Sequence, residues 1–495
     1  MPMKTKIIET DYLIIGSGAV GMAFADTLFH ETQCHMVIVD KHHGPGGHWN
    51  DAYSFVRLHQ PSAFYGVNSR ELGGEALDAS PLNYGMRERA SSAQIIDYYE
   101  QVMQVFLASG RVTYLPMSSY DFSQSDGDGL NQTELASRQI RSHQITSHII
   151  TSQITGDTTE VRVRKKLVDT TYLNTAVPST HPPQYKVGAG VRCVPLNDLP
   201  KVKSPPSGYV VVGAGKTGID ACLWLLENNV AADKICWIMP RDSWFQNRAN
   251  VQPGLQFFAQ TFGALALQME AIGKADSLSD LLHRLEADEQ LLRLDPTIEP
   301  SMYHAAVVSQ AELTELRKIK NVVRLGRIQR IDANAIVLDE GSVPSDPERL
   351  YVDCSATAAQ LRPIIPVFAG NKITPQFVRA FQPTFSAAFI AHVESTFESE
   401  AEKNLLCSVV PLPDKPVTWL TMQGINMANQ FRWNSNKDLG RWILQSRLDG
   451  FSATSRTIAK DDDENMAVLT RFRNAAMAAA MKIPVLIAKV NQPSN

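Results

Sequence analysis

The chain has 495 residues, of which 44% are hydrophobic and 20% charged, with a formal net charge of −4. This balance is ordinary for a globular protein of two to four domains and argues against nucleic acid or an anionic membrane as a partner. Six cysteines stand singly, as in a reduced intracellular protein. No apolar run approaches the ~18 residues of a membrane span and no signal segment is recognisable, so we expect a cytoplasmic protein without an integral membrane segment.

The first predicted unit runs from residue 12 to residue 40. An apolar, β-branched run is followed by Gly16, Gly18 and Gly21 in the G-x-G-x-x-G spacing, then by a helical pattern and a second apolar strand that ends at Asp40. Glycines in this turn let a pyrophosphate approach the free N–H groups of the helix start, and the acid accepts from ribose hydroxyls. The pattern predicts a dinucleotide site that favours FAD or NAD over NADP.

The chain then continues through loops toward the same sheet edge. Gly46 and Gly47 would bring the backbone close to a flat or phosphorylated ligand, and the segment 55–66 supplies His59 and Gln60. A helix is predicted over 91–109 and a strand over 111–115. A loop at 118–132 and a β-meander that ends on the strand at 167–172 follow, and the Pro-rich stretch 181–206 is expected to be a domain linker.

A second strand, glycine turn and helix begin at Tyr209. The turn contains Gly213, Gly215 and Gly218, and Val210 stands where a P-loop would need glycine. The next strand ends at Arg241, and a guanidinium at that place suits the 2′-phosphate of NADP. We expect Lys216 and Arg248 to add positive charge there. The two units thus predict two different dinucleotides, FAD in the first and NADPH in the second.

The remaining chain is expected to return to the first unit. Helices are predicted over 277–292 and 302–320, strands over 328–338 and 349–352, and residues 353–357 repeat the small-residue-plus-Thr pattern of 169–172. The predicted domains are therefore 1–203 for FAD, 204–350 for NADP with a helical insertion, and 351–495 for the return and a C-terminal substrate or capping region. In this last part a helix should begin near Gln382, and a helix over 466–490 should be interrupted at Pro484.

Taken together, these motifs resemble those of the flavin-containing monooxygenases and related class B flavoproteins with two dinucleotide-binding domains. The resemblance covers about residues 8 to 360 and rests on both glycine turns, the Gly-Gly-x-Trp-like run at 46–49 and the Ala-Thr-Gly-like strand end at 169–172. It implies an α/β fold with two Rossmann-like domains of the three-layer ββα type, the NADP domain inserted in the FAD domain, and a mixed C-terminal region.

The resemblance also implies residue roles. The dinucleotide-binding residues would be Gly16, Gly18, Ala19, Gly21, Asp40, Lys41, Gly47, His48, Trp49 and Thr170 for FAD, and Gly213, Gly215, Lys216, Thr217, Gly218, Arg241 and Thr357 around NADPH and the return crossing. His59 and Gln60 are the candidate catalytic residues, at the place where many family members have an asparagine near the flavin; a plain loop role for both is the alternative. No metal is expected.

The implied activity is oxygenation of a small molecule at N, S or C, with NADPH reducing FAD and O₂ captured as a flavin hydroperoxide. The Baeyer–Villiger fingerprint is missing between 186 and 206, which argues against ketone-to-ester oxidation. An FAD-dependent NAD(P)H dehydrogenase without oxygenation is the alternative, and a non-catalytic flavoprotein is a third reading. Disulfide reduction is excluded because no C-x-x-C pair follows the first turn. The substrate and a homodimer are left open.

Overall fold

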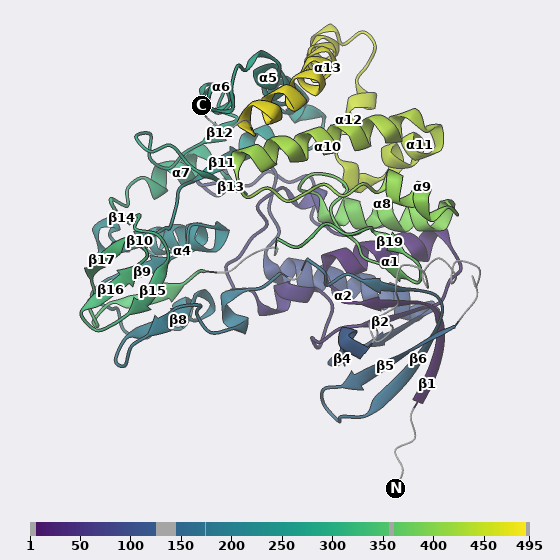
Figure 1. Cartoon of the computed structure of the whole chain (residues 1–495), viewed down its shortest axis with the longest axis horizontal. Coiled ribbons are helices and arrows are strands. Elements are labelled where there is room, and N and C mark those ends of the chain that lie inside the picture. Colours follow the sequence, from purple (N-terminus) through teal and green to yellow (C-terminus); the bar gives the residue numbers. More distant parts are fainter. Residues whose placement is uncertain (1–5, 125–144, 174, 356–360, 492–495) are drawn as a thin grey trace.

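The computed structural model describes residues 6–124, 145–173, 175–355 and 361–491. Two β-sheets, one mostly and one entirely parallel, form the centres of two units, and helices from the C-terminal part lie across both (Figure 1). The largest cluster of buried apolar side chains includes residues of both units, from Met22 in the first to Val211 and Trp237 in the second. The units therefore share a core. The α/β fold class with two Rossmann-like units, predicted from the sequence, is confirmed.

The first sheet has the main strand order β19-β20-β6-β1-β2-β3. Strands β1, β2, β3 and β6 are mutually parallel neighbours, and β4 and β5 extend β6 as an antiparallel meander. The strands are β1 Lys6–Ile15, β2 Met36–Val39, β3 Val112–Leu115, β4 Ser118–Tyr120, β5 Thr146–Ser152, β6 Thr158–Asp169, β19 Phe368–Ala369 and β20 Lys372–Ile373. The loop predicted at 118–132 thus begins with a strand, because Ser118–Tyr120 pairs with β5; residues from 125 lie outside the described ranges.

Three helices accompany the first sheet. Helix α1 (Ala19–Glu31) follows the first glycine turn, and α8 (Pro383–Thr396) packs along it. Helix α2 (Ser92–Ala108) begins where predicted, because Ser91 and Gln94 form a capping box. The helix expected near Gln382 is α8, with Pro383 at its first position, where a missing N–H costs nothing.

The second sheet has the strand order β14-β10-β9-β18-β8, with all neighbours parallel. Its strands are β8 Arg192–Pro195, β9 Tyr209–Val212, β10 Ile235–Ile238, β14 Asn321–Val323 and β18 Leu350–Asp353, and helix α4 (Lys216–Glu227) follows β9. A smaller sheet beside it contains β7 Lys186–Val187, β15 Ile328–Ile331, β16 Ala335–Leu338 and β17 Gly341–Pro344. Strands β7 and β8 therefore pair with the second unit although they precede residue 204, and the stretch 181–206 is more than a linker.

The insertion between β10 and β14 is not purely helical. Its elements are β11 Ser243–Asn247, α5 Phe258–Lys274, α6 Leu278–Ala287, β12 Leu291–Leu292, β13 Met302–Val308 and α7 Gln310–Leu316. The helix predicted over 302–320 is wrong in its first half, because Met302–Val308 is a strand parallel to β11. A capping box of Ser309 and Glu312 then starts α7, so the change from strand to helix falls at Ser309.

The C-terminal helices form a layer over both units (Figure 1). They are α9 Glu400–Leu406, α10 Pro416–Ser435, α11 Lys437–Gln445, α12 Ser452–Thr457 and α13 Asp463–Val490. The predicted interruption at Pro484 is wrong, since α13 continues through it. Proline inside a helix costs about 3 kcal/mol, but Ile483 and Leu486 on either side are buried in the cluster that α13 shares with α5, and each such burial contributes about 1.5–3 kcal/mol.

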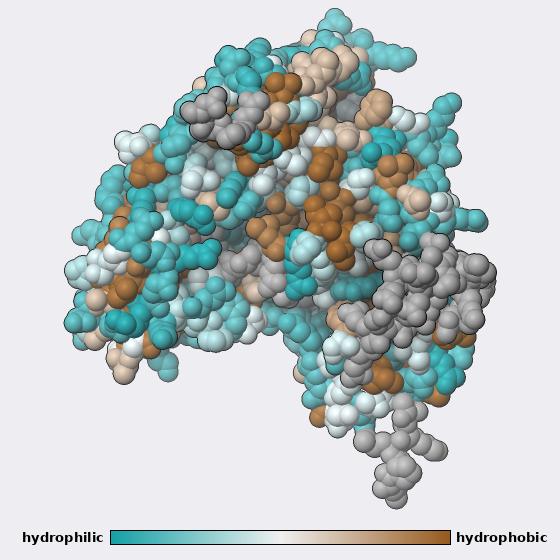
Figure 2. All heavy atoms as spheres, in the orientation of Figure 1, coloured by the Kyte–Doolittle hydropathy of each residue, from teal (hydrophilic) through white to brown (hydrophobic). Residues whose placement is uncertain are grey.

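Hydrophilic side chains cover most of the face shown in Figure 2, which is hollowed between the lobe of the first sheet and that of the second. Of the helices in the described ranges, none combines the length and apolarity needed to cross a bilayer. In the same ranges, no three His, Cys, Asp or Glu side chains form a group that could hold a metal ion.

Candidate dinucleotide sites

The first glycine turn is shaped by close backbone contacts. Gly16 has φ +101°, and a Cβ on Gly21 would lie 2.0 Å from the carbonyl oxygen of Gly16, so only glycine lets α1 approach β1 this closely. The hydroxyl of Thr170 donates to the carbonyl of Ile15 at 2.7 Å and fixes the strand end beneath the turn. Thr170 therefore supports the turn from β6.

The turn presents free backbone donors. The amides of Gly18, Ala19 and Val20 at the start of α1 have no hydrogen-bond partner among the described residues, as expected for the first turn of a helix. Gly47 lies directly on the turn, since a Cβ added to it would be 2.8 Å from Cα of Gly18. Backbone without side chains thus lines a helix N-terminus, which is the arrangement that binds the phosphates of a dinucleotide.

Asp40 stands at the end of β2 as predicted, but its carboxylate is already occupied. Oδ2 accepts from the amide of Ser17 at 2.5 Å and its hydroxyl at 2.8 Å, and Oδ1 accepts from the amide of His42 at 2.8 Å and pairs with Nδ1 at 2.9 Å. Burial alone would raise the pKa of Asp40, but these hydrogen bonds outweigh it and lower the pKa. For a ribose hydroxyl to donate to Asp40, it would have to replace the side chain of Ser17 or of His42 at the carboxylate. Lys41 beside it is exposed.

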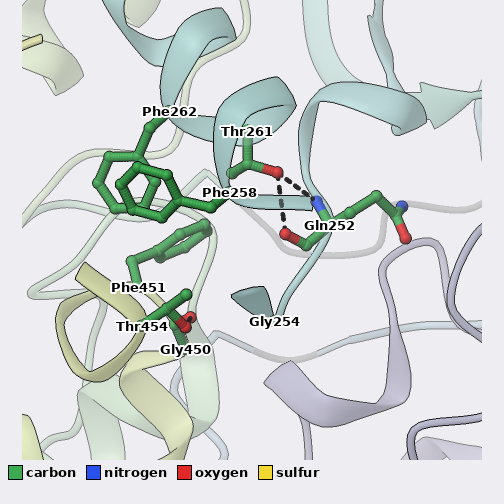
Figure 3. A pocket seen from close by; sticks show the side chains of 8 residues that line it. All are labelled: Gln252, Gly254, Phe258, Thr261, Phe262, Gly450, Phe451 and Thr454. Carbon is green, nitrogen blue, oxygen red and sulfur yellow. Dashed lines mark hydrogen bonds between the residues drawn. The ribbon is translucent and has the colours of Figure 1, made fainter. Parts of the chain in front are cut away.

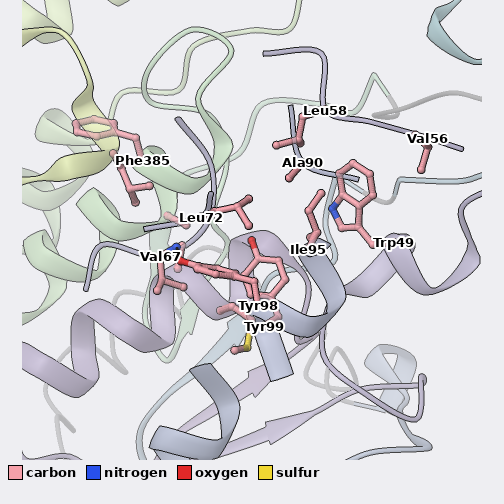
Figure 4. Close-up of a cluster of buried hydrophobic side chains, with 14 of the residues drawn as sticks. Trp49, Val56, Leu58, Val67, Leu72, Ala90, Ile95, Tyr98, Tyr99 and Phe385 are labelled. Atoms are coloured by element: carbon pink, nitrogen blue, oxygen red, sulfur yellow. Dashed lines mark hydrogen bonds between the residues drawn. The ribbon is translucent and has the colours of Figure 1, made fainter. Parts of the chain in front are cut away.

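The Gly-Gly-x-Trp-like run continues into an aromatic cluster (Figure 4). Trp49 is buried, and its Nε1 donates to the hydroxyl of Tyr65 at 2.7 Å. The His48 ring lies 5.0 Å from the Trp49 ring, and burial lowers the pKa of His48 to about 4. His48 is therefore neutral at physiological pH and offers no positive charge to a phosphate. Arg447 fixes this loop from the C-terminal part by donating to three carbonyls, including that of Val67 at 2.7 Å.

The second glycine turn repeats the first in one respect and differs in another. A Cβ on Gly218 would lie 2.1 Å from the carbonyl oxygen of Gly213, whereas a Cβ on Gly215 would meet nothing within 4 Å. The space above Gly215, beside half-buried Thr217, is thus open to a ligand. Lys216 is hydrogen-bonded to Asp220 one helical turn on, so its charge is partly used within α4.

Arg241 is placed as the sequence predicted. It follows β10 and Pro240, its side chain is exposed, and within the described ranges it makes no ion pair. Its neighbour Asp242 is instead buried and paired with Arg324, whose Nε lies 2.6 Å from Oδ2. A cation therefore remains available where a 2′-phosphate would lie. Thr357 lies outside the described residues.

His59 and Gln60 lie beside the second unit. Both are half-buried, and the carbonyl oxygen of His59 accepts from Nε of Arg248 at 3.1 Å. Burial lowers the pKa of His59 well below its usual range, and Lys216, Arg248 and Arg89 lower it further, so the ring is neutral. Their catalytic role stays a prediction.

Arg248 does not serve the NADP phosphate as expected from the sequence. It is only 1% exposed and is held by Glu312 at 2.7 Å and by Asn83 and Val307 at 3.2 and 3.1 Å. The reason is that β11 ends inside the protein, so the arginine after it points into the contact between the units. The capping-box spacing of Ser309 and Glu312 is a sequence signal that could have indicated Glu312, whereas no spacing indicates that Arg248 is buried.

The two crossings between the units are built alike. Oδ1 of Asp169 accepts from the amide and hydroxyl of Thr171, and Oδ1 of Asp353 accepts in the same way from Ser355. These matching turns end β6 and β18, as expected where a second domain is inserted into a first. Away from both turns, a shallow surface depression lies between α5 and the start of α12 (Figure 3), lined by residues that include Phe258, Phe262 and Phe451.

Comparisons with solved structures show only distant likeness. The chain is 12% identical to the polycyclic ketone monooxygenase of Thermothelomyces thermophila, covering 98% of this chain and 86% of that one with a TM-score of 0.48. It is 14% identical to a flavin-containing monooxygenase of Stenotrophomonas maltophilia, covering 81% and 99% with a TM-score of 0.40. It is 12% identical to a bacillithiol disulfide reductase of Bacillus cereus, covering 79% of this chain and 100% of that one with a TM-score of 0.42. Because the identities and TM-scores are this low, we infer the function from the residues of this chain and not from these structures.

Comparisons of sequence are more specific. A family described as NAD(P)-binding Rossmann-like domain matches residues 14–68, which contain the first glycine turn and Asp40. The chain is 47% identical over 449 residues to the uncharacterized protein Rv2000 of Mycobacterium tuberculosis, covering 90% of this chain and 78% of that protein, and the uncharacterized protein Mb2023 of Mycobacterium bovis gives the same values. The chain therefore belongs to the same family as these mycobacterial proteins.

Proposed function

We propose that this protein is an FAD-dependent, NADPH-using monooxygenase that oxygenates a small molecule. The observation that carries the proposal is the pair of glycine turns, because the strand after each turn ends at a side chain of opposite charge. A buried acid, Asp40, follows the first turn, and the second is followed by an exposed arginine, Arg241, that makes no ion pair with any described residue. An acid suits the ribose of FAD and an arginine suits the 2′-phosphate of NADPH.

The residues present fit both groups. The free amides at the start of α1 and the backbone of Gly47 would hold the FAD phosphates, and the open space at Gly215 would admit the NADPH phosphates. When bound, FAD supplies the redox and oxygen chemistry, while the protein binds, orients and excludes water. The cluster of buried Trp49 and Tyr99 with half-buried Tyr65 would keep water from the flavin side of the first turn.

The overall reaction would consume one NADPH, one proton and one O₂ per substrate, and would yield NADP⁺, water and the oxygenated product. The test is a stoichiometric assay of the purified protein reconstituted with FAD. NADPH oxidation, O₂ uptake and H₂O₂ release are measured with a panel of thioethers, tertiary amines and ketones. We expect O₂ uptake to equal NADPH oxidation, and an accepted substrate to lower H₂O₂ release while ¹⁸O from ¹⁸O₂ enters the product.

The result that contradicts this function is NADPH oxidation that needs an added electron acceptor and does not consume O₂. That outcome would instead indicate a flavin dehydrogenase. Failure to bind FAD at all would refute both. We expect the panel to favour amines or thioethers over ketones, because the Baeyer–Villiger fingerprint is missing from 186–206.

A further inference from the structure

A buried arginine without hydrogen bonds lies between the two units. Arg89 is 8% exposed, and among the described residues its side chain has one partner, Glu312, whose Oε1 lies 3.3 Å from Nη1 without hydrogen-bond geometry. Its Nε is buried and has no partner. Burying a guanidinium costs free energy unless its N–H groups donate to acceptors, so we expect an acceptor for the Arg89 side chain.

The acids around Arg89 are engaged elsewhere. Oε2 of Glu312 accepts from Arg248 at 2.7 Å and from the amide of Ser309 at 2.9 Å. Asp220 accepts from Lys216 and, at 2.6 Å, from the hydroxyl of Tyr53.

Two further acids also remain out of reach of the guanidinium. Asp78 accepts from Ser80 and Asn83, and exposed Glu227 makes no ion pair among the described residues. Within the described ranges, Glu312 is thus the one acid within 4.0 Å of the Arg89 nitrogens, and its stronger contacts are to other groups. The missing acceptor would therefore come from outside the chain.

The position of Arg89 is suited to a ligand that binds between the units. Nη1 of Arg57 donates to the carbonyl of Arg89 at 3.1 Å, and the amide of Leu58 donates to the carbonyl of Ala90 at 3.0 Å, so the segment that carries His59 runs beside Arg89. The Arg89 guanidinium also contacts Glu312 of α7, and α7 packs against α4, the helix that begins at Lys216. Burial lowers the pKa of Lys216, and Arg89 lowers it further. The guanidinium thus neighbours both the candidate catalytic segment and the helix that packs against α7 after the second glycine turn.

We propose that Arg89 binds an anionic group, a carboxylate or a phosphate, of a ligand that enters between the units beside His59 and the start of α4. Either group presents two oxygens in the plane that a guanidinium fork prefers, and binding in a desolvated place strengthens the contact. The anion could belong to the dinucleotide at the second turn or to the small-molecule substrate. The inference goes beyond the proposed function and does not depend on flavin chemistry.

The experiment compares the full-length protein with its Arg89→Met and Arg89→Lys variants. The thermal unfolding midpoint is measured without added anion and with inorganic phosphate or acetate at constant ionic strength, and NADP⁺ affinity is measured by titration. Arg192→Met is the matched control, because Arg192 is exposed on β8 and makes no ion pair among the described residues. Since the side chain of Arg89 makes no hydrogen bond among the described residues, Arg89→Met should not lower the midpoint of the protein without anions.

We expect phosphate or acetate to raise the midpoint of the wild-type protein and of Arg192→Met, but not of Arg89→Met, with a smaller rise in Arg89→Lys. If the anion is part of the dinucleotide, Arg89→Met also weakens NADP⁺ at least about tenfold. Unchanged NADP⁺ affinity assigns the anion to the substrate. Equal anion effects in wild type and Arg89→Met, or a lowered midpoint without anions and no anion-dependent difference, would overturn the proposal and make Arg89 structural.

Discussion

Replacing Arg248 with methionine should loosen the contact between the two units more than any surface change. The variant loses the hydrogen bonds to His59, Asn83 and Val307 and the ion pair with Glu312. Methionine fills much of the same volume, so the main effect is a buried carboxylate left with weaker partners. Breaking a buried pair from one side costs about 3–5 kcal/mol, against a total stability of about 5–15 kcal/mol for a typical domain.

The assay is urea unfolding followed by fluorescence, together with hydrogen exchange of the amides in β13 and α7. We expect Arg248→Met to lower the free energy of unfolding by about 3–5 kcal/mol and to speed exchange in α7, whose capping box contains Glu312. Arg192→Met, on the surface, should stay within about 0.5 kcal/mol of wild type. In the double variant Arg248→Met/Glu312→Met the loss should fall short of the sum by about 0.5–3 kcal/mol. A loss below about 1 kcal/mol, or strict additivity, would refute the assignment of Arg248 to a buried ion pair.

The remaining predictions concern the two glycine turns and their partners. Arg241→Ala should weaken NADPH far more than NADH in a binding titration, and equal losses would contradict its role at the 2′-phosphate. Gly215→Ala should fold normally, since its Cβ meets nothing within 4 Å, yet lose NADPH affinity. Weakened folding with intact NADPH binding would contradict this reasoning. Gly218→Ala, whose Cβ would lie 2.1 Å from the carbonyl oxygen of Gly213, should be unstable without any ligand. The pKa of His42 is raised by its hydrogen bond to Asp40, so its contribution to stability is complete below its ordinary value of about 6.5 and is lost as pH rises through the raised pKa. Wild type should therefore lose stability relative to His42→Asn as the pH rises above about 6.5, and parallel pH profiles would contradict the pairing.

The nucleotide folds could be predicted from the sequence because their determinants are local. The turn after β1 needs glycine where a Cβ would strike the Gly16 carbonyl, and the turn after β9 repeats this at Gly213, so spacing alone identifies both. Arg241 was found for the same reason, since the end of a second strand has a fixed place beside such a turn.

Features that depend on contacts distant in sequence escaped prediction. The run at 302–308 has no helical or strand signal strong enough to decide, and pairing with β11 decides it. The helix continues through Pro484 because Ile483 and Leu486 beside it are buried in a cluster with residues of α5. The occupied carboxylate of Asp40 depends on His42, whose Nε2 lies 2.7 Å from Asp51, and no spacing rule contains that triad.

A short segment of the first unit sets the distance between the two turns. It begins at Gly47 on the first turn, its Tyr53 donates to Asp220 of α4 at 2.6 Å, and the ring of Phe55 stacks on Trp224 at 5.1 Å. Its far end is fixed at the carbonyl of His59 by Arg248. The contacts of Tyr53, Phe55 and His59 join the two units, so the segment holds the second turn in a set position relative to the first. The buried ion pair of Arg248 and Glu312 thus closes the far end of this segment. Under the function proposed above, a hydride could pass between the two dinucleotides only while the two turns keep this relative position, and that is the constraint that Arg248 would provide.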